Sequence, residues 1–80
     1  MFKNKHNGKY NLCGEIIKNL RLNSPQKMSQ RALADKMQLI GIDVDKNAIQ
    51  RIECGKRFVT DIELKAFAQI FGTSLDELVK

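Results

Sequence analysis

Apolar residues recur through most of the chain at intervals of three and four positions, the spacing that places them on one face of an α-helix. No segment alternates between apolar and polar residues for more than a few positions, as a half-buried strand would. The pattern therefore predicts an all-α protein with five helical segments.

Capping residues indicate where the first two helices begin and end. Asn11 is expected to cap a helix that runs to about Leu22, and Ser29 to cap a second helix that Gly41 ends. The apolar stripe of the first helix consists of Cys13, Ile16, Ile17 and Leu20. That of the second consists of Leu33, Met37 and Ile40.

Three further helices, of which the last is short, complete the predicted fold. Their expected caps are Asp45, Thr60 and Ser74. Thr60 and Ser74 are each followed three positions later by a glutamate, which is the spacing of a capping box. The third helix is KNAIQRIE, residues 46–53, and Gly55 is expected to end it. The apolar residues of the last two helices are Leu64, Phe67, Ala68, Phe71, Leu75 and Leu78.

The basic residues are concentrated in the first three quarters of the chain. Eighty residues are enough for one small domain, with a net charge of +5. Residues 1–60 hold 12 Lys and Arg against 5 Asp and Glu, whereas residues 61–80 hold 2 against 4. A basic region of this kind favours a polyanionic partner.

The residue types that carry most enzymatic and metal chemistry are scarce. Cys13, Cys54 and His6 are too few for a zinc site without carboxylates, and no glycine-rich phosphate loop or pairing of a nucleophile with a base is found. We therefore expect no enzymatic activity, no metal and no cofactor. The lack of a long apolar run and of a secretory signal favours a cytoplasmic protein with reduced cysteines and no membrane partner.

The helix predicted over residues 46–53 has two different faces when its residues are placed about 100° apart. One face carries Lys46, Asn47, Gln50 and Arg51, and the other carries Ile49 and Ile52. Lys and Arg pair with guanine in the DNA major groove, and Asn and Gln pair with adenine. The polar face is therefore a candidate for reading bases, although the solvated face of an ordinary amphipathic helix can have the same composition.

Glu53 is an acid inside the basic stretch RIECGKR and lies at the edge of the apolar face. A partly buried carboxylate needs a cationic partner, because burying it alone costs stability. Arg21, at the end of the first helix, is the best candidate because a guanidinium can bind a carboxylate through two hydrogen bonds.

Several segments together resemble the lambda-repressor and Cro family of helix-turn-helix DNA-binding domains. They are CGEIIKNLR, SQRALADKM and NAIQRIECGKR, with FGTSLDEL similar to the closing segment of the family. The resemblance covers about Leu12 to Val79 and implies a five-helix DNA-binding domain. In that family an Arg matching Arg21 and a Glu matching Glu53 form a salt bridge that ties the first helix to the recognition helix.

The resemblance also implies roles in DNA contact. The positions that match the base-reading face are Lys46, Asn47, Gln50 and Arg51. The positions that match phosphate contacts are Ser29 and Gln30 at the start of the second helix, and Lys56 and Arg57 in the loop after the third. Ala34 matches the small residue at which the second and third helices cross.

The chain departs from the family pattern in two places. The family places the apolar residue of the recognition helix about ten positions after that alanine, whereas Ile49 follows Ala34 by fifteen. MQLIGIDV, residues 37–44, is therefore expected to form an extended second helix followed by a loop that ends at Asp45. Cys54 replaces an Asn that is frequent beside the glycine.

The function implied is that of a sequence-specific transcriptional regulator, in particular a repressor, that binds double-stranded DNA as a homodimer. Residues 1–11 are expected to form a flexible basic arm ahead of a domain spanning residues 12–80. Dimerisation would use this arm, the DNA, or the last helix with Leu75, Leu78 and Val79. The alternative is a protein-interaction module, such as an antitoxin or a repressor antagonist, that uses the acidic residues 61–80.

Overall fold

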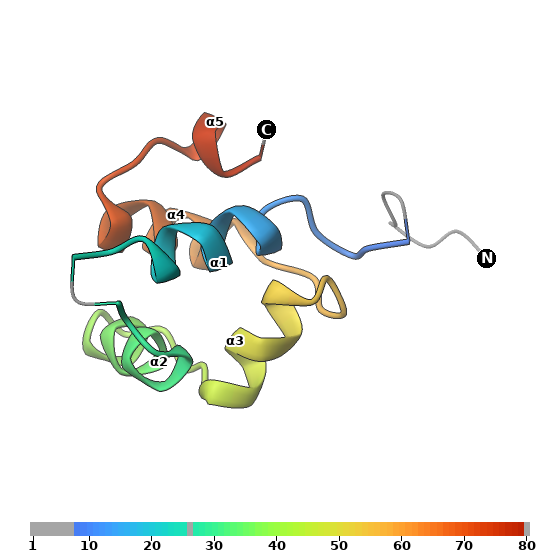
Figure 1. The fold of residues 1–80 in the computed structure, drawn as a ribbon. Coiled ribbons are helices and arrows are strands. Elements are labelled where there is room, and N and C mark those ends of the chain that lie inside the picture. Colours follow the sequence, from blue (N-terminus) through green and yellow to red (C-terminus); the bar gives the residue numbers. More distant parts are fainter. Residues whose placement is uncertain (1–7, 26, 80) are drawn as a thin grey trace.

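The computed structural model describes residues 8–25 and 27–79, and these residues contain five α-helices and no strand (Figure 1). The helices are α1 (Gly14–Leu22), α2 (Gln30–Leu39), α3 (Lys46–Glu53), α4 (Asp61–Phe71) and α5 (Leu75–Leu78). The prediction of an all-α fold is confirmed.

Polar side chains begin the helices α2 to α5 by accepting a hydrogen bond from the amide three residues later. The donor–acceptor pairs are Ala32 to Ser29 at 3.0 Å, Ala48 to Asp45 at 2.8 Å, Glu63 to Thr60 at 3.2 Å and Glu77 to Ser74 at 3.2 Å. Each bond satisfies an amide that has no partner within its helix, which explains why these four helices begin where the caps predicted. The prediction for the first helix was wrong, because α1 begins at Gly14 with Cys13, not Asn11, as its N-cap residue.

The helices pack around a core in which α1 and α4 lie together, with α5 on one side and α2 and α3 on the other (Figure 1). The core side chains that are fully buried are Ile17, Leu33, Met37, Ile49, Ile52, Phe67 and Leu78. They come from all five helices, so each helix is held by its apolar stripe and leaves its polar face free. Burial of this surface is the main force that orients α3.

The connection between α2 and α3 differs in part from the expectation. α2 ends at Leu39, so Ile40 does not continue the apolar stripe of that helix and is 40% exposed. Gly41 then turns the chain with a φ of +90°, a conformation that favours glycine. Residues 40–45 form a loop that is attached to α2, because the Gln38 side chain in the last turn of that helix donates to the Val44 carbonyl at 2.9 Å.

Gly14 allows α1 to approach the end of α3 closely. This glycine is buried, and a Cβ atom at its position would collide with the backbone carbonyl of Ile52. The first turn of α1 therefore lies directly against the C-terminal end of α3, which limits how α3 can tilt.

The last helix contributes to the core through one side chain. Leu78 is fully buried, whereas Leu75 and Val79 are exposed. Among the helices in the described residues, none combines the length and the apolar character that crossing a bilayer requires.

Candidate nucleic-acid interface

α3 presents one polar face to solvent and buries the other. Its exposed side chains are Lys46, Asn47, Gln50 and Arg51, the same four that the sequence placed on one face. Ile49 and Ile52 hold the opposite face in the core. Gln50 and Arg51 also line a surface hollow together with Cys54 and Lys56 beyond the end of the helix. The structure thus gathers polar and cationic groups on one rigid, exposed surface.

A buried ion pair joins α1 to α3. Arg21 Nε donates to Glu53 Oε2 at 2.7 Å, and Arg21 Nη2 donates to Glu53 Oε1 at 2.9 Å. The two side chains are 9% and 2% exposed, so solvent hardly competes for either group. Arg21 Nη1 also donates to the Met28 carbonyl at 3.0 Å, just before α2. Glu53 therefore lies on the inner side of α3, away from the exposed polar face.

The start of α2 is tied to the same ion pair. Gln30 Nε2 donates to Glu53 Oε1 at 3.0 Å, so Glu53 links α1, α2 and α3. Ser29 caps the helix at an exposed position. An exposed helix N-terminus attracts anions, because its first amides have no partner within the helix.

The two cations after α3 have different surroundings. Lys56 is exposed, whereas Arg57 donates to Glu63 Oε1 at 2.9 Å and to Glu63 Oε2 at 2.8 Å. These hydrogen bonds lower the pKa of Glu63 and raise the pKa of Arg57, even though burial opposes both shifts. Glu63 thus holds the Arg57 guanidinium within the domain, although the Arg57 side chain stays 31% exposed.

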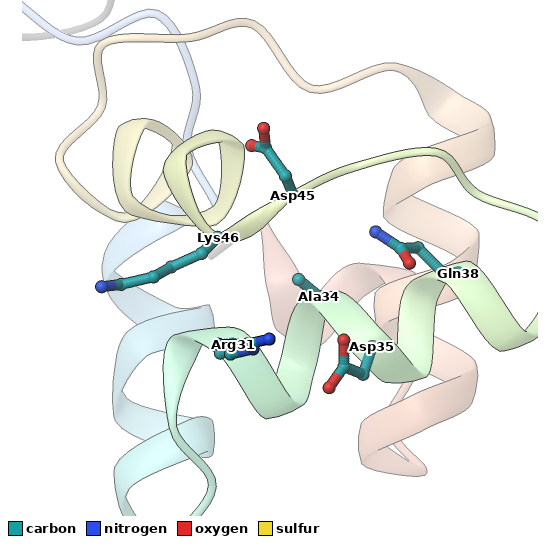
Figure 2. Close-up of a pocket in the computed structure, with 6 residues that line it drawn as sticks. All are labelled: Arg31, Ala34, Asp35, Gln38, Asp45 and Lys46. Carbon is teal, nitrogen blue, oxygen red and sulfur yellow. The ribbon is translucent and has the colours of Figure 1, made fainter.

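A second hollow lies between α2 and the first residue of α3, where Ala34 is small enough to let the two elements approach (Figure 2). Its charged lining residues are Arg31, Asp35, Asp45 and Lys46. Arg31 was not singled out in the sequence, although it follows Gln30 directly in the first turn of α2. The two acids offset the two cations, so the hollow is not a simple anion site.

Part of the expected basic arm is attached to the domain. The Tyr10 amide donates to the Gly55 carbonyl at 2.8 Å, and Lys9 Nζ lies 3.6 Å from Glu15 Oε2. Residues 1–7, with Lys3, Lys5 and His6, lie outside the described residues.

The cysteines differ in their exposure, since Cys13 is buried and Cys54 is exposed. Burial raises the pKa of the Cys13 thiol to about 11, so this thiol stays protonated near neutral pH. Within residues 8–25 and 27–79, no group of three His, Cys, Asp or Glu side chains is placed to hold a metal ion.

The chain was compared with known proteins. A family model described as Helix-turn-helix matches residues 17–78, a span that runs from the middle of α1 to the end of α5. Comparison with curated proteins and with solved structures found no match. The matched span contains α2 and α3 as well as the core that supports them. The chain therefore belongs to the Cro/CI-type helix-turn-helix family, a family of DNA-binding regulators.

Proposed function

We propose that this protein regulates transcription by reading double-stranded DNA with the exposed face of α3. The observation that carries the proposal is that α3 has two distinct faces. Its outer face exposes Lys46, Asn47, Gln50 and Arg51, and its inner face is buried in the core. Reading bases requires side chains held at fixed positions, and the buried pair between Arg21 and Glu53 supplies that rigidity.

The contacts divide into two classes in this proposal. Lys46, Asn47, Gln50 and Arg51 read base edges in the major groove. Ser29 and Gln30 at the N-terminus of α2, and Lys56 after α3, bind backbone phosphates on either side. Gln30 Nε2 donates one hydrogen to Glu53 and keeps a second N–H for a phosphate. We do not propose Arg57 as a phosphate-binding residue, because its side chain is paired with Glu63.

We further infer that the protein acts as a homodimer and as a repressor. α3 has 8 residues, so it is about 12 Å long and spans roughly four base pairs. A site that short occurs too often in a genome to be specific, whereas two copies on a palindrome double the sequence that is read. A dimer that occupies a promoter blocks access to it, which makes repression the form of regulation that we propose.

The second candidate function is protein binding through the C-terminal part of the chain. The observation in its favour is that apolar side chains, namely Ile62, Leu75 and Val79, are exposed there beside Asp61 and Asp76. An antitoxin or a repressor antagonist would use such a surface and would not depend on the face of α3.

The test is selection of bound sequences from a pool of random duplex DNA at moderate salt. We expect enrichment of a motif with two related half-sites. A variant that carries both Asn47→Ala and Gln50→Ala should lose this motif, whereas Lys36→Ala and Lys65→Ala together, which remove two exposed cations elsewhere, should keep it. Failure of the wild-type protein to enrich any motif would contradict DNA reading and would favour the second candidate.

A further inference from the structure

Residues 9–11, which we call the strap, cross the C-terminal end of α3 and the loop that follows it. The Tyr10 amide donates to the Gly55 carbonyl at 2.8 Å, and the Tyr10 and Phe58 rings meet edge to face with centroids 4.8 Å apart. The Lys9 side chain covers Gly55, because a Cβ atom at this buried glycine would lie 2.7 Å from Lys9 Cγ. The strap and the loop thus make contact over consecutive residues.

Asn11 joins three parts of the fold through one side chain. Its Oδ1 accepts a hydrogen bond from the Gly14 amide at 2.8 Å, at the start of α1. Its Nδ2 donates to the Ile52 carbonyl at 3.1 Å and to the Arg57 carbonyl at 2.7 Å. The first bond holds the amide of the first residue of α1, while the other two hold the last turn of α3 and the far end of the loop at a fixed separation.

Lys56 lies between the points at which the loop is held. The carbonyl before it, from Gly55, accepts from Tyr10, and the carbonyl after it, from Arg57, accepts from Asn11. Its own amide donates to the Arg51 carbonyl at 2.8 Å, which ties it to α3. The backbone of this residue is therefore held on both sides while its side chain remains exposed.

We propose that Asn11 is a positioning residue for DNA binding, which acts by holding Lys56 at a fixed place relative to the reading face of α3. The proposal rests on the function proposed above, since Lys56 is taken to bind phosphate. Asn11 itself needs no contact with DNA. Without its two donor hydrogen bonds, the far end of the loop would lose one of its attachments and move more, and DNA would have to order Lys56 when it binds.

The experiment uses Asn11→Ser in the full chain. A serine hydroxyl can still accept from the Gly14 amide, as Ser29 and Ser74 accept from the amides three residues later, but it cannot reach the Ile52 and Arg57 carbonyls. We expect affinity for the DNA selected by the wild-type protein to fall on the order of tenfold. The loss corresponds to the contact between Lys56 and a DNA phosphate, because a hydrogen bond between charged groups is worth about that factor. Ser74→Ala, which removes a helix cap far from the strap, is the control for lost stability and should leave affinity unchanged.

A double-mutant cycle with Lys56→Ala separates positioning from a general loss of stability. If Asn11 acts through Lys56, adding Asn11→Ser to Lys56→Ala should change the affinity for DNA by less than about twofold, since the Lys56 side chain that Asn11 positions is already gone. Fully additive losses, or wild-type affinity in Asn11→Ser, would overturn the proposal.

Amide hydrogen exchange without DNA separates this proposal from the function on which it rests. In Asn11→Ser, exchange at the Tyr10 and Lys56 amides should become faster, whereas exchange at the Ala32 amide, which Ser29 holds at the start of α2, should not change. Unchanged exchange at Tyr10 and Lys56 would refute the positioning role, whether or not the wild-type protein selects a DNA sequence.

Discussion

At the scale of single residues, Arg51 and Lys56 carry the same charge but lie on different parts of the backbone. Arg51 is on the exposed face of α3, and Lys56 follows Gly55 beyond the end of the helix. Both line the same hollow, so electrostatic attraction alone would make them equivalent. In the proposed mode of binding the geometry makes them different, because Arg51 would enter the groove with Asn47 and Gln50, whereas Lys56 would stay at the DNA backbone.

We predict that Arg51→Ala narrows the gap between the affinity for the selected site and the affinity for random DNA. Losing a base contact should cost ~1–3 kcal/mol on the selected site and relax preference at one base position. Lys56→Ala should instead weaken binding to both DNAs alike. It should also reduce, by about one, the slope of the logarithm of affinity against the logarithm of salt concentration. The measurement is affinity for both DNAs across a salt series, and identical behaviour of the two variants would contradict the assignment of a reading face.

Glu63 makes stability depend on pH. Its hydrogen bonds with Arg57 lower its pKa below the ordinary value of 4.5, so the unfolded chain takes up a proton at a higher pH than the folded domain does. The stability contributed by this carboxylate is therefore fully present above about pH 4.5 and is lost as the pH falls through the lower pKa of the folded state. We predict that the unfolding free energy of Glu63→Gln, measured with urea, falls less steeply below pH 4.5 than that of the wild-type protein. Asp61→Asn, which removes an exposed acid from the same turn of α4, is the control.

At the scale of elements, the link between α1 and α3 depends on Arg21 and Glu53 as a unit. Breaking a buried pair by removing one partner leaves a buried charge without compensation, which costs about 3–5 kcal/mol. We predict a loss of ~3 kcal/mol for Glu53→Ala and a similar loss for Arg21→Ala. The double variant should lose less than the sum, and chemical unfolding of all four proteins measures the coupling. Additive losses would mean that the pair contributes no coupling energy.

At the scale of the whole molecule, α2 and α3 lie on the opposite side of the core from α5 (Figure 1). The exposed cations proposed to meet DNA belong to α3 and the loop after it, whereas α5 carries the acids Asp76 and Glu77. A copy bound through α3 would therefore turn its acidic side away from the DNA, where it adds little repulsion.

We predict that two copies bind the selected site and that affinity depends on half-site spacing. Half-sites read by a symmetric dimer lie about 10–10.5 base pairs apart, so that both face the same side of the duplex. Inserting five base pairs between them should abolish cooperative binding, while inserting about ten should restore part of it. The mass of the complex and its affinity at each spacing test this. One bound copy, or affinity independent of spacing, would contradict a dimer.

The local features of this fold follow from the sequence because they depend on neighbours along the chain. A cap needs only an amide three residues later, and an apolar stripe needs only helical spacing. The bounds of α3, from its cap Asp45 to the turn at Gly55, could therefore be predicted, as could the exposed face between them. Arg21 was found as the partner of Glu53 because a buried carboxylate needs a cation, and because the resemblance to a known family pointed to the same pair.

The remaining features were decided by contacts between residues that are distant along the chain or whose surroundings the pattern does not specify. Nothing in the spacing of Arg57 and Glu63 predicts their ion pair, because it depends on how the loop after α3 lies against the start of α4. Asn11 was expected only to cap the first helix, but Cys13 is the N-cap residue, and Asn11 instead bonds to carbonyls 41 and 46 positions away as well as to the Gly14 amide. Ile40 fits the apolar stripe of the second helix, but α2 ends at Leu39 and the chain turns at Gly41, so the Ile40 side chain does not enter the core. Sequence determines which groups are available for bonding, and only packing determines which of them come within reach of one another.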